Sequence, residues 1–267
     1  MRLPWLFAAA MVVSGTAAHA GLEIQNIQAS YGPLGPERKS LEFYPSDEVF
    51  FRYLITGVKV DDEGRLAGDL NLTLEAPDGR VLFDQTSPIS GATALGGGTL
   101  PGSAKVSLPA DIAPGAYTLT VTFRDKQSSE KASFRRTLDL KPAEFAAVAV
   151  RFSYDAEGEV AAPVGSLVGQ TLHFRLKAIG FARTTGRIDV EMVVRVLDEQ
   201  GRPTMPVPVR AAVVSDDADL VRRATDVSLN GNMTLNREGD FTLSITINDR
   251  VGQKTTESEA PLHVENP

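Results

Sequence analysis

The sequence predicts an all-β protein made of two tandem antiparallel β-sandwich domains. Two observations predict this fold class. Segments about 123 residues apart repeat one another, and each copy contains short segments in which apolar and polar residues alternate. An alternation with a period of two is typical of antiparallel strands that have one side on a core. Many short strands without a long helix favour a sandwich.

The repeat connects segments from one end of the mature chain to the other. VFFRYLITGV at 49–58 matches LHFRLKAIGF at 172–181, and GAYTLTVTFRDK at 115–126 matches GDFTLSITINDR at 239–250. The offset between the copies changes by only one or two residues over this distance. A period of this length indicates two complete domains rather than a solenoid, whose units span about 20–50 residues.

The first twenty residues predict a cleaved secretory signal peptide. Arg2 supplies the positive charge, a short apolar run follows, and Ala18-His19-Ala20 presents small residues to the peptidase. The run is too short to span a bilayer, and the alternative is a buried N-terminal helix. We expect the mature chain to begin at Gly21 and to be extracytoplasmic, either periplasmic or secreted.

Strands are expected in order along both copies. The alternation is clearest in segments 49–56, 70–75, 115–126, 172–179, 188–196 and 239–250. Turn signals separate them, among them Pro77-Asp78-Gly79 and Glu199-Gln200-Gly201. One short helix is expected at 215–224, with Ser215 as its N-cap.

The stretch KPAEF at 141–145 is the only candidate for a linker, since alternation resumes at Val148. A linker this short restrains the angle between domains. We therefore expect a signal peptide at 1–20, one domain at 21–142 and a second at 143–267.

The segment PGAYTL places Tyr117 two residues after a turn glycine, at the head of a strand rich in Thr. This resembles the tyrosine corner of immunoglobulin-like sandwiches, in which the Tyr hydroxyl bonds back to the chain. Leu119 stands where antibody-type domains have a Cys, and the second copy has Phe241 in place of the Tyr. The resemblance implies two tandem immunoglobulin-like antiparallel β-sandwich domains of a bacterial type after the cleaved signal peptide. It does not imply a function.

Composition excludes several function classes. Without residues 1–20 the chain has 26 Lys and Arg against 34 Asp and Glu, a net charge of −8. An acidic chain with no basic run is a poor partner for nucleic acid or for anionic membranes. The chain has no Cys, so an exported protein of this sequence must be stable without disulfides, and thiolate chemistry is excluded.

The sequence gives no catalytic, cofactor-binding or metal-binding residues, and we expect a protein that is not an enzyme and has no cofactor. Only His173 and His263 remain after cleavage, too few for a zinc site. The acidic run Asp61-Asp62-Glu63-Gly64 is typical of a hairpin turn and lacks the spacing of a calcium loop, although a bound calcium ion is the alternative. The Gly96-Gly97-Gly98 run lacks the Lys of a phosphate loop, so a flexible loop is expected there.

The candidate partner-binding residues are Phe50, Arg52 and Leu54, which alternate with the expected core residues of their strand. An exposed apolar pair around a guanidinium suits a protein contact. The alternative is that the neighbouring domain or the loop at 86–102 covers these residues.

The sequence therefore favours a secreted or periplasmic, non-enzymatic binding or structural module that engages a protein or a cell-envelope partner. The alternative is a carbohydrate-binding accessory protein. The mature chain has few Tyr and no Trp, and this counts against sugar binding.

Overall fold

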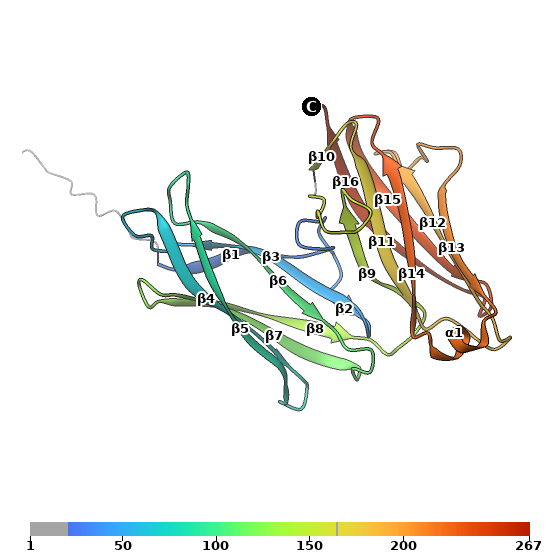
Figure 1. Ribbon diagram of the computed structural model, residues 1–267, viewed down its shortest axis with the longest axis horizontal. Helices are drawn as coiled ribbons and strands as arrows, with labels where there is room; N and C mark the ends of the chain where they lie inside the picture. The colour runs from blue at the N-terminus through green and yellow to red at the C-terminus, as the bar shows by residue number, and fades with distance from the viewer. Residues whose placement is uncertain (1–20, 164) are drawn as a thin grey trace, which may run out of the picture.

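The computed structural model describes residues 21–163 and 165–267. These residues form sixteen strands and one short helix, and the strands belong to four sheets. The fold is all-β with two sandwiches, as the sequence predicts (Figure 1). The predicted signal peptide lies outside the described residues.

The first sandwich pairs a three-stranded sheet, β1–β3–β6, with a five-stranded sheet, β2–β8–β7–β4–β5. Its strands are β1 (Glu23–Ser30), β2 (Glu42–Phe43), β3 (Glu48–Thr56), β4 (Arg65–Glu75), β5 (Val81–Ala92), β6 (Leu100–Ser107), β7 (Gly115–Asp125) and β8 (Lys131–Leu140). Phe51, Leu119 and Phe123 are among the buried residues of the core between the sheets. All strand pairs are antiparallel except β2 with β8, a parallel pair that the sequence pattern does not reveal.

The second sandwich has the sheets β9–β11–β14 and β10–β16–β15–β12–β13. Its strands are β9 (Ala146–Ser153), β10 (Gly165–Leu167), β11 (Thr171–Ile179), β12 (Ile188–Leu197), β13 (Val209–Ser215), β14 (Asp226–Thr234), β15 (Gly239–Asp249) and β16 (Lys254–Glu265). Phe174, Met192 and Ile245 are among the buried core residues. Here too one pair, β10 with β16, is parallel.

The two sandwiches share one topology, strand for strand, including the parallel pair. They also share a β-bulge, in β1 between Gln25 and Gln28 and in β9 between Val148 and Arg151. Inside each bulge a residue other than Gly has a positive φ, 52° at Asn26 and 51° at Ala149. This conformation is uncommon for such residues, so its recurrence supports duplication of a whole domain.

The predicted helix is present but shorter than expected. Helix α1 (Ala218–Arg223) has Asp217 as its N-cap, whose side chain accepts a hydrogen bond from the Leu220 N–H at 2.8 Å. The prediction of Ser215 as the cap is wrong, because Ser215 ends β13 and its hydroxyl accepts a hydrogen bond from the Asp217 N–H. Within the described residues, no helix has the length and apolar character needed to cross a membrane.

The tyrosine corner is present in the first sandwich. The buried Tyr117 hydroxyl donates a hydrogen bond of 2.9 Å to the Ala113 carbonyl, as the resemblance to immunoglobulin-like domains implies. Phe241 takes the equivalent place in the second sandwich and is only half-buried. The two copies therefore differ at this end, although their strands match.

Candidate partner-binding surface

The outer face of the β1–β3–β6 sheet carries the three residues that the sequence singles out. In β3, Phe51 and Tyr53 belong to the core of the first sandwich, whereas Phe50, Arg52 and Leu54 do not. The predicted alternation along this strand is therefore confirmed.

Phe50 is covered by the second domain. Its side chain is 5% exposed, and the Arg151 guanidinium and the Lys105 ammonium each lie 5.7 Å from its ring centroid. Lys105 comes from the neighbouring strand β6, and Arg151 comes from β9 of the second sandwich. The sequence left open whether Phe50 is exposed or covered, and in the structure it is covered.

The segment 86–102, which the sequence suggested as a covering loop, is mostly strand. Residues 86–92 belong to β5 and residues 100–102 belong to β6, so only 93–99 form the loop between them. The element that covers Phe50 is the second domain, through Arg151, and not this loop.

Glu48 connects the two cations above Phe50. Arg151 donates from both Nε and Nη2 to the Glu48 carboxylate, and the Lys105 ammonium lies 2.9 Å from the same carboxylate. Burial raises the pKa of Glu48, but the hydrogen bonds and charges of Arg151 and Lys105 outweigh this effect and hold the pKa below its usual value. A bidentate Arg–carboxylate pair fixes orientation as well as distance, so this contact restrains the angle between the domains.

Asp47, the residue before, bonds to the backbone of the second domain. One of its oxygens accepts hydrogen bonds of 2.8 Å from the N–H groups of Glu48 and Ala149. The other oxygen lies 2.8 Å from Nη1 of Arg38, which neutralises a carboxylate that is 1% exposed. The positive-φ residue in the bulge of β9 is thus held by the first domain.

An apolar contact adds to the contacts between the two domains. Tyr44 packs on a small buried cluster of Ala146, Val148 and Ile179, and its hydroxyl donates to the Glu144 carboxylate at 3.2 Å. These groups combine shape, charge and hydrogen bonds across one surface. We name the contact formed by Tyr44, Asp47, Glu48, Ala149 and Arg151 the domain junction.

The other end of the sheet face is more exposed than Phe50. Arg52 donates to the Leu34 carbonyl at 3.4 Å and to Oε1 of Gln28 at 3.5 Å, whereas its buried Nε has no hydrogen-bond partner among the described residues. Leu34 is 48% exposed and Leu54 is half-buried. Of the three predicted residues, only Arg52 and Leu54 are at least partly exposed, and Leu34 lies beside Arg52. We name Leu34, Arg52 and Leu54 the β3 surface.

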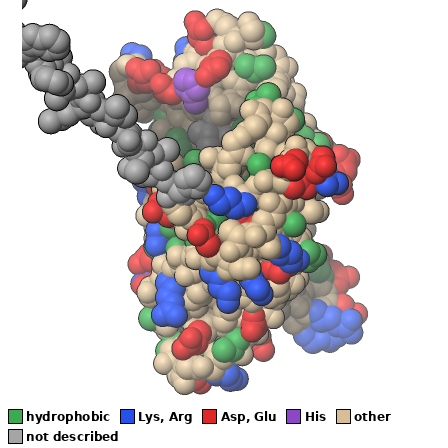
Figure 2. All heavy atoms as spheres, turned by 90° about the vertical axis from the view of Figure 1, so that its left-hand side faces the viewer, with side chains coloured by type: hydrophobic (Ala, Val, Ile, Leu, Met, Phe, Trp, Pro, Cys, Tyr) green, Lys and Arg blue, Asp and Glu red, His purple; other side chains and the backbone are tan. Residues whose placement is uncertain are grey.

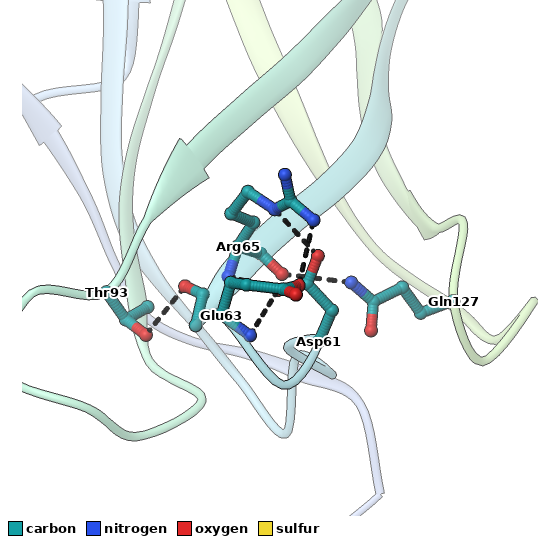
Figure 3. A network of polar contacts seen from close by, with 6 residues as sticks. Asp61, Glu63, Arg65, Thr93 and Gln127 are labelled. Atoms are coloured by element: carbon teal, nitrogen blue, oxygen red, sulfur yellow. Dashed lines mark hydrogen bonds and ion pairs between the residues drawn. The ribbon is translucent and has the colours of Figure 1, made fainter.

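The loops at the distal end of the first domain are held by a polar network (Figure 3). Asp61 accepts from the N–H groups of Glu63 and Arg65 and from Nε of Arg65, and Thr93 and Gln127 tie two further loops to this turn. Since the Asp61 oxygens receive these N–H groups, its carboxylate stabilises the hairpin turn. This is the role that the sequence predicted for the acidic run.

The two histidines among the described residues, His173 and His263, lie on different sheets. His173 is a half-buried residue of β11, and His263 in β16 contacts Asp240 at 2.6 Å and Glu265 at 3.2 Å. These two carboxylates raise the pKa of His263. In the part of the chain that the structure describes, no three His, Asp or Glu side chains are grouped to hold a metal ion.

Sequence reasoning missed the junction residues and a pair of buried aspartates. Asp125 accepts from the N–H groups of Lys59, Gln127 and Ser128, and Asp249 accepts from Ala182 and two residues of its own turn. Asp125 and Asp249 occupy equivalent positions in the two copies, and this recurrence could have identified them from the sequence. Asp47 does not recur in this way, because Gln170 occupies the matching position of the second copy.

Comparison with known proteins does not show a family for this chain. No protein-family model and no curated protein matches the chain. Among solved structures, red sea bream transglutaminase is 9% identical over 92% of this chain, with a TM-score of 0.29, and this chain spans 31% of its length. The C-terminal domain of the Streptococcus pyogenes antigen I/II-family protein AspA is 10% identical, with 91% of this chain and 99% of that chain covered and a TM-score of 0.29.

A third similar structure is the C-terminal domain of the Streptococcus agalactiae antigen I/II polypeptide BspA, 10% identical over 89% of this chain and 99% of that chain, with a TM-score of 0.28. Likeness at these TM-scores carries no conclusion about function.

Proposed function

We propose that this protein is an extracytoplasmic, non-enzymatic binding module that holds a protein partner on the β3 surface. The extracytoplasmic location follows from the predicted signal peptide at 1–20. The observation that supports the binding role is the incomplete cover of one sheet face. The second domain covers the Phe50 end, while Leu34, Arg52 and Leu54 remain accessible to a partner at the other end.

The chemistry of this surface suits a protein better than a nucleic acid. The Nη1 and Nη2 atoms of Arg52 make only long hydrogen bonds, 3.4 Å to the Leu34 carbonyl and 3.5 Å to Gln28, so a carboxylate or carbonyl of a partner can improve their hydrogen bonding. Arg beside apolar side chains is a common anchor of protein contacts. On the side of the molecule shown in Figure 2, acidic and basic side chains are interspersed.

A carbohydrate ligand remains the second candidate from the sequence, and the structure offers it less support. Sugar-binding faces use stacked exposed aromatic rings, whereas Phe50, the aromatic residue of this face that the sequence offered, is buried under Arg151. A protein partner is therefore the proposal for the β3 surface.

The test is affinity capture from the exported fraction with residues 21–267. We compare the wild type with an Arg52→Ala, Leu54→Ser double variant. The matched control is Arg175→Ala with Lys177→Ser, the equivalent positions of the second domain. The proposal expects one protein to be retained by the wild type and the control and lost from the β3 variant. Equal retention by all three, with all three folded, would overturn it.

A further inference from the structure

The second sandwich has a cavity of about 350 Å³ with both apolar and polar lining residues. It lies at the end of the domain that carries the β14–β15 loop, which is near the C-terminus in Figure 1. Its apolar lining includes Met205, Met233, Leu235, Phe241, Leu262 and Val264. Thr204, Thr234 and Asn236 add polar groups, and Arg237 is the charged residue among the described lining. Its volume falls within the range of small-molecule sites, about 300–1,000 Å³.

The first domain shows why this end is open in the second. Its loop between β6 and β7 covers residues 108–114 and places Ile112 in the core, beside the Tyr117 corner. The corresponding loop of the second domain covers only 235–238, three residues fewer. The second copy therefore has no residue in the place of Ile112, and Phe241 stays half-buried on the cavity wall.

The charge at the cavity mouth points to the class of ligand. The Arg237 guanidinium stacks 5.1 Å from the Phe241 ring centroid, and no described residue forms an ion pair with it. Two methionines give the wall a flexible apolar surface that adapts to a chain. We propose that this cavity binds a single-chain anionic amphiphile, with the apolar chain between the sheets and its carboxylate at Arg237.

Methionine methyl NMR tests this directly, because the mature chain has only three methionines. Met205 and Met233 line the cavity, whereas Met192 lies in the core and does not. We titrate residues 21–267, labelled at the methionine methyl groups, with decanoate below its micelle concentration. The expected result is a saturable shift of the Met205 and Met233 signals with little change at Met192.

Two matched amphiphiles and two variants separate the parts of the proposal. Decyltrimethylammonium has a cationic head on the same chain and should bind much more weakly than decanoate. Arg237→Gln should weaken decanoate binding about threefold to tenfold, the range for one exposed charge contact. Replacing residues 235–238 by the sequence of 108–114, together with Phe241→Tyr, should close the cavity and abolish the shifts.

Three results would overturn the proposal. They are unmoved Met205 and Met233 signals, equal binding of the two amphiphiles, and undiminished decanoate binding by the Arg237→Gln variant. The Met192 signal and thermal unfolding will reveal whether the loop replacement folds. If it does not fold, decanoate binding by the wild type and by Arg237→Gln still tests the proposal. The cavity is in the second domain and the β3 surface is in the first, so the two proposals can fail separately.

Discussion

The buried carboxylate of Asp47 in the first domain accepts a 2.8 Å hydrogen bond from the N–H of Ala149 in the second. Ala149 has a φ of 51°, in a region that costs a residue with a Cβ about 1–3 kcal/mol. The hydrogen bond stabilises this bulge, and the bulge presents its N–H to Asp47. The fold of the second domain and its position against the first are therefore coupled through one contact.

Removing this carboxylate should loosen the domain junction. Asp47→Ala leaves the Arg38 cation and the Ala149 N–H without their partner, and we expect a loss of about 3 kcal/mol in the free energy of unfolding. The measurement is urea unfolding, with hydrogen exchange of the Ala149 amide alongside. Gln170→Ala, at the equivalent position of the second domain, is the control and should change the free energy by less than about 1 kcal/mol. An Asp47→Ala variant as stable as the control would contradict this role.

Asp125 should make stability depend on pH. Burial raises its pKa, but hydrogen bonds from Lys59, Gln127 and Ser128 outweigh the burial, so the pKa lies below its ordinary value of 3.8 in the folded state. A carboxylate with a lowered folded pKa stabilises the fold above its unfolded pKa, about 3.9, and loses this contribution as pH falls through the folded value. The stability difference between wild type and Asp125→Asn should therefore be constant above about pH 5 and shrink in more acidic solution.

The control for this pH dependence is Asp111→Asn, because Asp111 is exposed. The free energy of unfolding of both variants and the wild type is measured from about pH 2 to about pH 7, roughly two units below and three above the unfolded pKa. A constant difference between wild type and Asp125→Asn across the whole acidic range would show that the lowered pKa is wrong.

The tyrosine corner should stabilise the first domain by about one hydrogen bond. Tyr117→Phe removes the donor to Ala113, and we expect a loss of about 0.5–1.5 kcal/mol. Phe241→Tyr should bring no comparable gain, since the shorter loop of the second domain has no residue in the place of Ala113. Thermal and urea unfolding of both variants provide the comparison. Equal stability of Tyr117→Phe and wild type would remove the corner as a stabilising contact.

The domain boundary predicted from the repeat can be tested with fragments 21–142 and 143–267. Each contains two complete sheets and its own buried core, so each should unfold cooperatively when expressed alone. Fragment 143–267 should be less stable than the same domain in the whole chain, because Ala149 and Arg151 lose their partners in the first domain. A fragment without a cooperative transition would place the boundary elsewhere.

The strands that repeat in both copies could be predicted from the sequence, whereas the contacts that differ between the copies could not. The alternation around Phe51 and Phe174 predicts the strands, because burial on one side imposes a period of two. The parallel pairing of β2 with β8 is invisible, since two residues carry no pattern. The cover over Phe50 depends on Arg151, which is more than a hundred residues away, and no local rule relates them.

The central claim is that the two sandwiches form one unit, fixed at the domain junction. Double electron–electron resonance measures this most directly, because the chain has no native Cys to compete with the introduced labels. We place one label at Val81 in β5 and one at Val214 in β13, both about half-exposed on strands of different domains. We expect one narrow distance distribution in the wild type and a broad one in Asp47→Ala. A broad distribution in the wild type, or an unchanged one in the variant, would contradict it.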